Sequence, residues 1–365
     1  MIGSVMAPTP GESDLALAHL TQCLRAQLAG AAAPEPPPAG VADLAVSIAL
    51  SAKLPSLAGR YLDVTGQRSA ALAQYAAATM SRNAEACREI SSVSRALTAR
   101  NIDFITIKGP LQHFDLYGSY FVRRSSDIDL VVRRADFATA KSSISDLGYL
   151  LSTVSYWWEA VLGEVHFERA EPVRGAIDLH WHTHQPGVPS VRSETVFFKR
   201  TANAILDGQQ IPILDRDGTR LLIVISIAKA LYNREPSAAY ICDLFQSLIP
   251  ASPGAINSFL TDADRQGVGG HAAIALRLVK AMFGDAFPYD PASAPVLTSW
   301  SSDDLLRMAF LPRAESTAWP RRRELVWQFC GRSPLRYAQE FALIGLSEIV
   351  RRIFERGTAR AAHRD

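Results

Sequence analysis

The chain has 365 residues, a length that favours roughly two domains and allows large apolar cores. Its 38 basic and 36 acidic residues leave a formal charge of +2, a balance that argues against a nucleic-acid coat protein or a polybasic membrane binder. Hydrophobic residues make up 48% of the chain and charged residues 20%, as in an ordinary globular protein. A largely disordered chain is therefore excluded.

The four cysteines lie far apart and include no C-x-x-C pair: Cys23, Cys87, Cys242 and Cys330. Disulfide-rich and zinc-ribbon frameworks are therefore excluded, and buried free thiols are expected. The N-terminus carries acidic residues where a signal peptide needs a basic start and an apolar run. The longest strongly apolar stretch, 221–228, is far shorter than the roughly 20 residues that span a bilayer. We expect a cytoplasmic protein with no membrane partner.

Helical patterns dominate the first hundred residues. Leucines recur on one stripe over 13–30, and the proline-rich stretch that follows cannot continue a helix. Further helices are expected over about 41–53 and 67–100. We therefore expect an N-terminal helix and proline-rich linker over 1–40, and a helical region over 41–100 that packs on the core.

The pattern changes in the next part of the chain. Short β-branched runs predict strands at 104–108, 127–132 and 176–181. A helix is expected at 136–147, and an Asp-Gly turn signal predicts a hairpin at 205–214.

Helical patterns return from Leu221 onward and are interrupted by prolines. The expected fold is α+β, with an α+β core over 101–215 and a helical C-terminal domain over 216–365.

Asp127 and Asp129 are the sharpest chemical feature of the sequence. Alternate side chains of a strand share a face, so the two carboxylates point the same way while Ile128 and Leu130 point into the core. Neighbouring carboxylates repel each other unless a cation lies between them. Oxygen ligands of this kind suit Mg²⁺ or Mn²⁺ that also binds phosphate oxygens. The pair therefore predicts a divalent-metal site.

A third carboxylate, Asp178, lies in another apolar strand between Ile177 and Leu179. Aspartate is unfavoured on a half-buried strand, so its presence there needs a reason. If this strand lies beside the first, three acids converge on one face, as two-metal phosphoryl chemistry requires. One ion would bind a triphosphate, and the other would lower the pKa of an attacking hydroxyl, with Asp178 as the supporting base.

Phosphate ligands are expected upstream, where a strand ends at Lys108-Gly109 and a helix follows. Gly109 lets the backbone approach a phosphate closely, and the amides at a helix N-terminus favour anions. Lys108 and the forked guanidinium of Arg123 could pair with phosphate charge.

Three histidines alternate along the chain after Asp178. On a continuing strand His180, His182 and His184 would share its face and could build a zinc site, although Pro186 suggests that the strand ends earlier. The other interpretations are that His180 orients Asp178 or a phosphate, or that it is a structural histidine.

Together these residues resemble the bacterial uncharacterised nucleotidyltransferase family, which belongs to the DNA polymerase β-like nucleotidyltransferase superfamily. The resemblance is close over about 100–185 and looser in the helical surroundings. It depends on these residues: Ile107-Lys108-Gly109, Tyr117-Gly118, Arg123, Ser126-Asp127-Ile128-Asp129-Leu130-Val131-Val132, Gly148-Tyr149 and Ile177-Asp178-Leu179-His180-Trp181.

The resemblance implies a mixed-sheet core of the polymerase β type that binds NTP, such as ATP, and a divalent metal. Asp127 and Asp129 match the metal-binding pair, Asp178 the third acid, and Lys108-Gly109 the phosphate loop. The superfamily usually has a serine after this glycine, whereas the present chain has a proline without a hydroxyl.

Two later residues also match positions of the family. Asp243 resembles a helical aspartate that follows the core. Lys229 stands where many relatives have a histidine, so no catalytic role is expected for it.

We therefore expect an enzyme that transfers a nucleoside monophosphate from an NTP to an acceptor and releases pyrophosphate. A small molecule, peptide or protein is favoured as the acceptor over a long nucleic acid, given the balanced charge. One alternative is an inactive NTP-binding or interaction module with the same fold. A second is a metal-dependent hydrolase that uses His180, His182 and His184.

Overall fold

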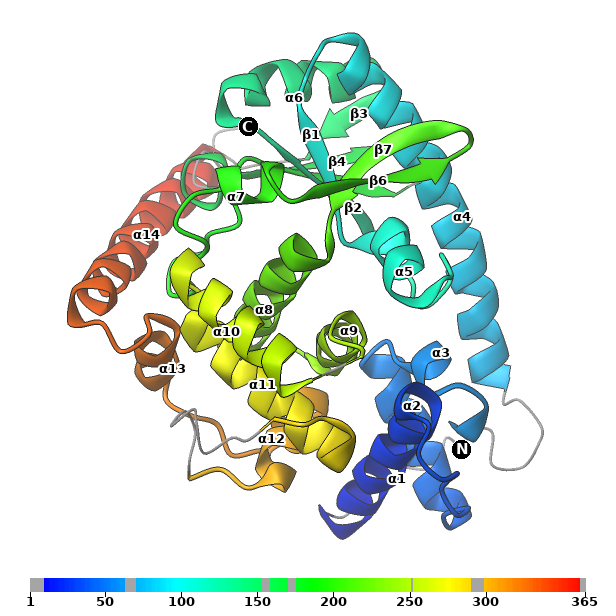
Figure 1. The fold of residues 1–365 in the computed structure, drawn as a ribbon. Helices are drawn as coiled ribbons and strands as arrows, with labels where there is room; N and C mark the ends of the chain where they lie inside the picture. Colours follow the sequence, from blue (N-terminus) through cyan, green and yellow to red (C-terminus); the bar gives the residue numbers. More distant parts are fainter. Residues whose placement is uncertain are drawn as a thin grey trace.

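The computed structural model describes most of the chain, namely residues 10–62, 70–152, 158–169, 175–250, 252–289 and 299–361. Seven strands form one sheet in this part of the chain (Figure 1): β1 (Phe104–Ile107), β2 (Asp127–Val132), β3 (Tyr149–Leu151), β4 (Glu164–Arg169), β5 (Ala176–His180), β6 (Thr201–Leu206) and β7 (Gln209–Leu214). The strand order is β3-β4-β5-β2-β1-β7-β6. Because β2 pairs parallel with β5 but antiparallel with β1, the sheet is mixed.

Helices surround the sheet. Those before or between the strands are α1 (Pro10–Ala29), α2 (Ala39–Ser51), α3 (Pro55–Ala58), α4 (Ala70–Ala99), α5 (Gly109–Tyr117), α6 (Phe137–Asp146) and α7 (Thr195–Phe198). Those after the strands are α8 (Arg216–Asn233), α9 (Ala238–Ser247), α10 (Pro253–Gln266), α11 (Gly269–Phe283), α12 (Ser302–Phe310), α13 (Arg322–Phe329) and α14 (Pro334–Ala361). The expected α+β class is confirmed.

The two faces of the sheet pack against different helices. Ile128 and Leu130 of β2 lie in a buried cluster with Ile90 of α4 and Ile144 of α6. Val131, on the opposite face of β2, belongs to a second cluster that contains much of α8, α9 and α11. Since side chains alternate along a strand, Asp127 and Asp129 lie on the same face as Val131 and are directed toward the C-terminal helices.

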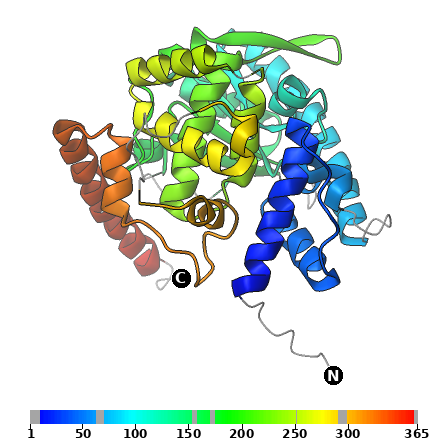
Figure 2. The same ribbon diagram turned by 60° about the horizontal axis from the view of Figure 1, so that its bottom comes forward.

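The first helix contacts two helices of the C-terminal part, although they are far apart in the chain. Arg25 of α1 donates from Nε to the Met282 carbonyl of α11 (2.6 Å), and Arg307 of α12 pairs with Asp14 of α1 (2.8 Å). Both views place α1 and α14 on opposite sides of the bundle of α8–α11 (Figures 1 and 2). One hydrophobic cluster therefore includes side chains from both ends of the chain and from the sheet. The division of the chain into four parts stays a prediction.

Several predicted elements are confirmed. The strand predicted at 127–132 is β2, and the helix predicted at 136–147 is α6. The Asp207-Gly208 turn joins β6 and β7 as a hairpin, although β6 begins earlier than predicted, at Thr201. Strands β3 and β4 were not predicted.

The described cysteines and helices agree with two further expectations. All four cysteines are free thiols, and Cys23, Cys242 and Cys330 are buried. Burial raises the pKa of the Cys330 thiol to about 11. Among the described helices, none combines the length and the apolar character that crossing a membrane demands.

His271 of α11 gives a first testable expectation. Its ring is buried and stacks on Phe329, with ring centroids 4.9 Å apart. Burial and the charge of Arg336 lower its pKa from 6.5 to about 3. Between these values the unfolded chain binds a proton that the folded protein excludes, so this group makes stability fall as the pH drops below about 6.5.

We expect His271→Leu to remove this contribution. Between pH 7 and pH 5 the wild type should lose about 2 kcal/mol more of its unfolding free energy than the variant. Urea denaturation of both proteins at the two pH values measures the difference. Equal losses in the two proteins would contradict the assignment of the acid sensitivity to His271.

Candidate active site

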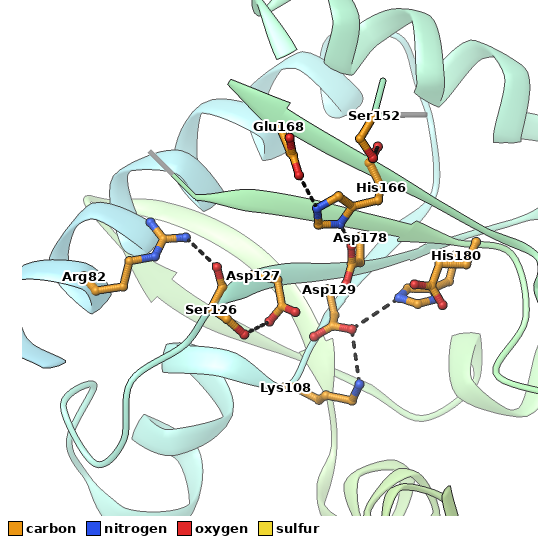
Figure 3. A network of polar contacts seen from close by, with 11 residues as sticks. Arg82, Lys108, Ser126, Asp127, Asp129, Ser152, His166, Glu168, Asp178 and His180 are labelled. Atoms are coloured by element: carbon orange, nitrogen blue, oxygen red, sulfur yellow. Dashed lines mark hydrogen bonds and ion pairs between the residues drawn. The ribbon is translucent and has the colours of Figure 1, made fainter. Parts of the chain in front are cut away.

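Polar side chains gather on one face of three neighbouring strands. In the sheet register Asp129 of β2 lies opposite Asp178 of β5, which in turn lies opposite His166 of β4. His180 lies opposite Glu164. Because residues two apart share a face, this register collects seven ionisable residues on one surface: Glu164 and the six labelled in Figure 3, namely Asp127, Asp129, His166, Glu168, Asp178 and His180.

Asp129 is held as a carboxylate by two neighbours. Lys108 Nζ lies 3.2 Å from its Oδ1, and His180 Nε2 lies 3.2 Å from the same oxygen. Burial alone would favour the neutral acid, but Lys108 and His180 together hold the pKa of Asp129 well below its usual range. The charge of Asp129 is therefore available at neutral pH.

The pKa of Asp178 is shifted in the opposite direction. Burial and the nearby charge of Asp129 raise its pKa to about 6. Its Oδ1 lies 2.5 Å from His166 Nδ1, and the far nitrogen of His166 lies 3.3 Å from Glu168. Strongly perturbed pKa values caused by burial and a neighbouring charge are typical of functional sites.

The donor atoms suit a divalent ion. One ligand atom from each of Asp129, Asp178 and His180 can be chosen so that all three lie within 4.8 Å of one another. Asp127 lies two residues before Asp129, accepts a hydrogen bond from Ser126 Oγ (3.0 Å) and lines the same cavity. The three predicted acids and His180 thus lie together in space.

The three acids and His180 line a cavity of about 440 Å³. Its other walls come from Lys108-Gly109 at the start of α5, from the end of α2, and from Lys229 of α8 and Tyr240 of α9. This volume is within the usual range for small-ligand sites.

The backbone at the start of α5 is unusual. Lys108 has φ +59° and ψ −163°, and Gly109 has φ +66°. Non-glycine residues adopt such a conformation only where the surrounding structure imposes it, and such residues cluster at functional sites. The turn places Lys108 beside Asp129 and exposes Gly109 to the cavity.

Arg123, predicted as a phosphate ligand, forms an ion pair with a buried aspartate. Its two terminal nitrogens donate to the two oxygens of Asp243 on α9, at 2.7 and 2.5 Å, and Asp243 is fully buried. Tyr117 Oη also donates to Asp243, at 2.8 Å. The guanidinium that was expected to bind phosphate is bonded to a carboxylate. A phosphate would have to compete with Asp243 for it, so the role of Arg123 as a phosphate ligand stays a prediction.

The loop that leads to Asp127 is held from two sides. Asn83 of α4 donates to the carbonyls of Tyr120 (2.6 Å) and Arg123 (2.8 Å) and accepts from the Ser125 amide (2.9 Å). Asp243 holds the same loop from the other side through the Arg123 guanidinium. These bonds fix the entry of the chain into β2 and hence the position of Asp127.

Lys229 was named from the sequence but was assigned no role. It lies half-buried on α8, lines the cavity and has no hydrogen bond or ion pair among the described residues. Burial and the charge of Lys108 lower its pKa to about 8. The available signal was a single cation within the apolar helix LLIVISIAKALY.

His166 and Glu164 were missed. They alternate with the buried Val165 and Phe167 on β4. This alternation is typical of a half-buried strand and could have revealed both residues.

The other two histidines of the alternating run lie apart from the acids. His184 Nε2 lies 3.1 Å from Glu340 Oε1 on α14, and burial lowers the pKa of His182 to about 4. Within the described residues, the three histidines do not form a joint group of metal ligands.

A protein-family model described as uncharacterised nucleotidyltransferase matches residues 55–284. Among curated proteins none matches the chain. The solution structure of the antibiotic-resistance factor ANT(2'')-Ia is similar at 11% identity and a TM-score of 0.35, over 50% of this chain and 92% of that one. The crystal structure of an antigenic nucleotidyltransferase-like protein from Paracoccidioides brasiliensis is similar at 16% identity and a TM-score of 0.33, over 50% and 88%.

Proposed function

Because the chain belongs to the uncharacterised nucleotidyltransferase family, we propose that it transfers a nucleoside monophosphate from an NTP to an acceptor and releases pyrophosphate. The observation that supports this reaction most directly is the convergence of Asp127, Asp129 and Asp178 beside one polar cavity of about 440 Å³.

The acids would hold a divalent ion, Mg²⁺ or Mn²⁺. The close donor atoms around Asp129 and the raised pKa of Asp178, which lies beside another carboxylate, fit such an ion. When bound, it would neutralise phosphate charge and lower the pKa of an attacking hydroxyl.

The chain's own residues would orient the reactants and take up the proton. The acceptor oxygen forms a bond to the α-phosphorus, and the bond from that phosphorus to the bridging oxygen breaks, so pyrophosphate leaves with the electron pair. Asp178 would take the proton of the acceptor hydroxyl, and the hydrogen bond from His166 fixes the orientation of this carboxylate.

The triphosphate would lie along the cationic wall of the cavity. Lys108, the backbone of Gly109 and Lys229 all line the cavity. Lys108 already pairs with Asp129, whereas Lys229 has no partner among the described residues, so Lys229 is the cation that gains most from a bound phosphate.

We expect Lys229→Met to weaken the binding of pyrophosphate with Mg²⁺ by about 10- to 100-fold, because one charge-assisted contact is lost while the length of the side chain is kept. Titration calorimetry measures the affinity. Lys199→Met, at an exposed position outside the cavity, serves as the matched control. Unchanged affinity in Lys229→Met would remove this lysine from the phosphate site.

The acceptor is proposed to be a hydroxyl group on a small molecule, peptide or protein. A cavity of about 440 Å³ that also holds a nucleotide leaves room for a small reacting group. The near-zero net charge argues against a long nucleic acid as the acceptor, because binding many phosphates requires an excess of basic residues.

The test is incubation of the purified protein with each labelled NTP, Mg²⁺ or Mn²⁺, and cell extract, followed by mass spectrometry. A product heavier by one nucleoside monophosphate, together with pyrophosphate, is the expected result. Binding of NTP without any consumption would favour an inactive binding module. Release of a hydrolysed product without transfer would favour a metal-dependent hydrolase.

A further inference from the structure

The imidazole of His180 lies between two carboxylates. Its Nε2 lies 3.2 Å from Asp129 Oδ1, and its Nδ1 lies 3.5 Å from Glu164 Oε2. His180 is only 8% exposed, and the sheet register places it opposite Glu164 on the face that carries Asp178. Its ring therefore joins the cluster of acids to a further carboxylate on β4.

This position creates a hydrogen-bonding conflict for a neutral ring. A neutral imidazole donates from one nitrogen and presents a lone pair on the other. In each neutral tautomer one lone pair faces a carboxylate: that of Nδ1 faces Glu164 when Nε2 donates to Asp129, and that of Nε2 faces Asp129 when Nδ1 donates to Glu164. An ion bound by Nε2 and the acids removes this repulsion, because Nδ1 can then donate to Glu164 while the Nε2 lone pair binds the ion.

The arrangement matches a known pattern of metal sites. A histidine that binds a metal through one nitrogen usually donates its other N–H to a carboxylate, which fixes the ring and raises its basicity. Glu164 occupies the place of that carboxylate. The ligand atoms of Asp129, Asp178 and His180 lie within 4.8 Å of one another, and donors on opposite sides of an ion with bonds of about 2.0–2.2 Å are about 4.0–4.4 Å apart.

We infer that His180 is a ligand of the ion held by Asp129 and Asp178, that Glu164 orients it, and that the site therefore prefers a divalent transition ion such as Mn²⁺ over Mg²⁺. This inference rests on the proposed function, since it concerns the ion of the same site. Magnesium selects oxygen ligands and keeps its waters, whereas imidazole nitrogen suits first-row transition ions. Three acids alone would give no such preference.

The first test is pulsed electron paramagnetic resonance of the full-length protein loaded with Mn²⁺. A ¹⁴N coupling from a directly bound imidazole is expected in the wild type and should disappear in His180→Gln. His184→Gln is the matched control, since His184 belongs to the same alternating run but bonds Glu340. The ¹⁴N coupling should persist in the His184→Gln variant.

Calorimetry supplies a second readout. His180→Gln should weaken Mn²⁺ binding by more than about 10-fold and reduce the preference for Mn²⁺ over Mg²⁺, and Glu164→Gln should weaken Mn²⁺ binding by about 10-fold through the lost orientation of the ring. Glu164→Gln retains the imidazole of His180 and changes only its partner, so it tests the inference even if His180→Gln fails to fold.

The outcomes separate this inference from the proposed function. If the wild type consumes NTP and binds Mn²⁺ without any ¹⁴N coupling, His180 is not a ligand and the inference is overturned, while the proposed function stands. If Glu164→Gln and His180→Gln both keep the Mn²⁺ preference of the wild type, the inference also fails. A wild type that binds neither Mn²⁺ nor NTP would refute both.

Discussion

Asp127→Asn is expected to lower nucleotidyl transfer by more than about 100-fold, because losing even an outer partner of a metal ligand costs about 10- to 100-fold, and a direct ligand should cost more. Asparagine keeps the shape of the side chain but removes the charge that would bind the ion. Asp127 is half-buried at the start of β2 and bonds Ser126, so the fold should persist.

Initial rates with saturating NTP and metal measure the loss, and circular dichroism checks the fold. Asp103→Asn is the matched control: Asp103 is an exposed carboxylate that pairs with Arg133 away from the cavity, and its variant should keep full activity. Wild-type activity in Asp127→Asn would refute the assignment of this acid to the metal.

Asp243→Ala is expected to destabilise the protein by about 3–5 kcal/mol, the usual loss when one partner of a buried ion pair is removed. Asp243 is fully buried, and the Arg123 side chain is 8% exposed. The variant leaves the guanidinium of Arg123 and the hydroxyl of Tyr117 without their shared acceptor. The loop before Asp127 then loses its anchor on α9.

Urea denaturation gives the change in unfolding free energy. The control is Asp146→Ala, which breaks an exposed pair with Arg100 at 2.6 Å and should cost less than about 1 kcal/mol. If Asp243→Ala costs no more than this control, the Arg123–Asp243 pair does not hold the core to the C-terminal helices.

The strands that carry the acids could be predicted because their patterns are local. Ile128 and Leu130 alternate with Asp127 and Asp129, so one run of six residues defines both the strand and the face of the carboxylates. The resemblance to a nucleotidyltransferase family depends on the same residues, and the family match over 55–284 confirms it.

Strands β3 and β4 escaped prediction for a local reason as well. β3 has only three residues, and in β4 the low intrinsic strand preference of the glutamates competes with the strand signal from the alternation of Val165 and Phe167 with polar residues. Because β4 was not predicted, the residues of β4 that lie opposite Asp178 and His180 were not predicted either. His166 and Glu164 therefore entered the site only when the register of β4 and β5 was known.

The sequence by itself determined the α+β class, the presence of acids on the strands β2 and β5, and the reaction class of the family. Only the tertiary structure decided which charges face one another: Arg123 pairs with Asp243, 120 residues later in the chain, and Lys229 remains without a partner among the described residues. The balance of 38 basic and 36 acidic residues says nothing about these choices. Periodicity is local, whereas ion pairs and the pKa values they set depend on distance and burial, which exist only after strands and helices distant in sequence have packed together.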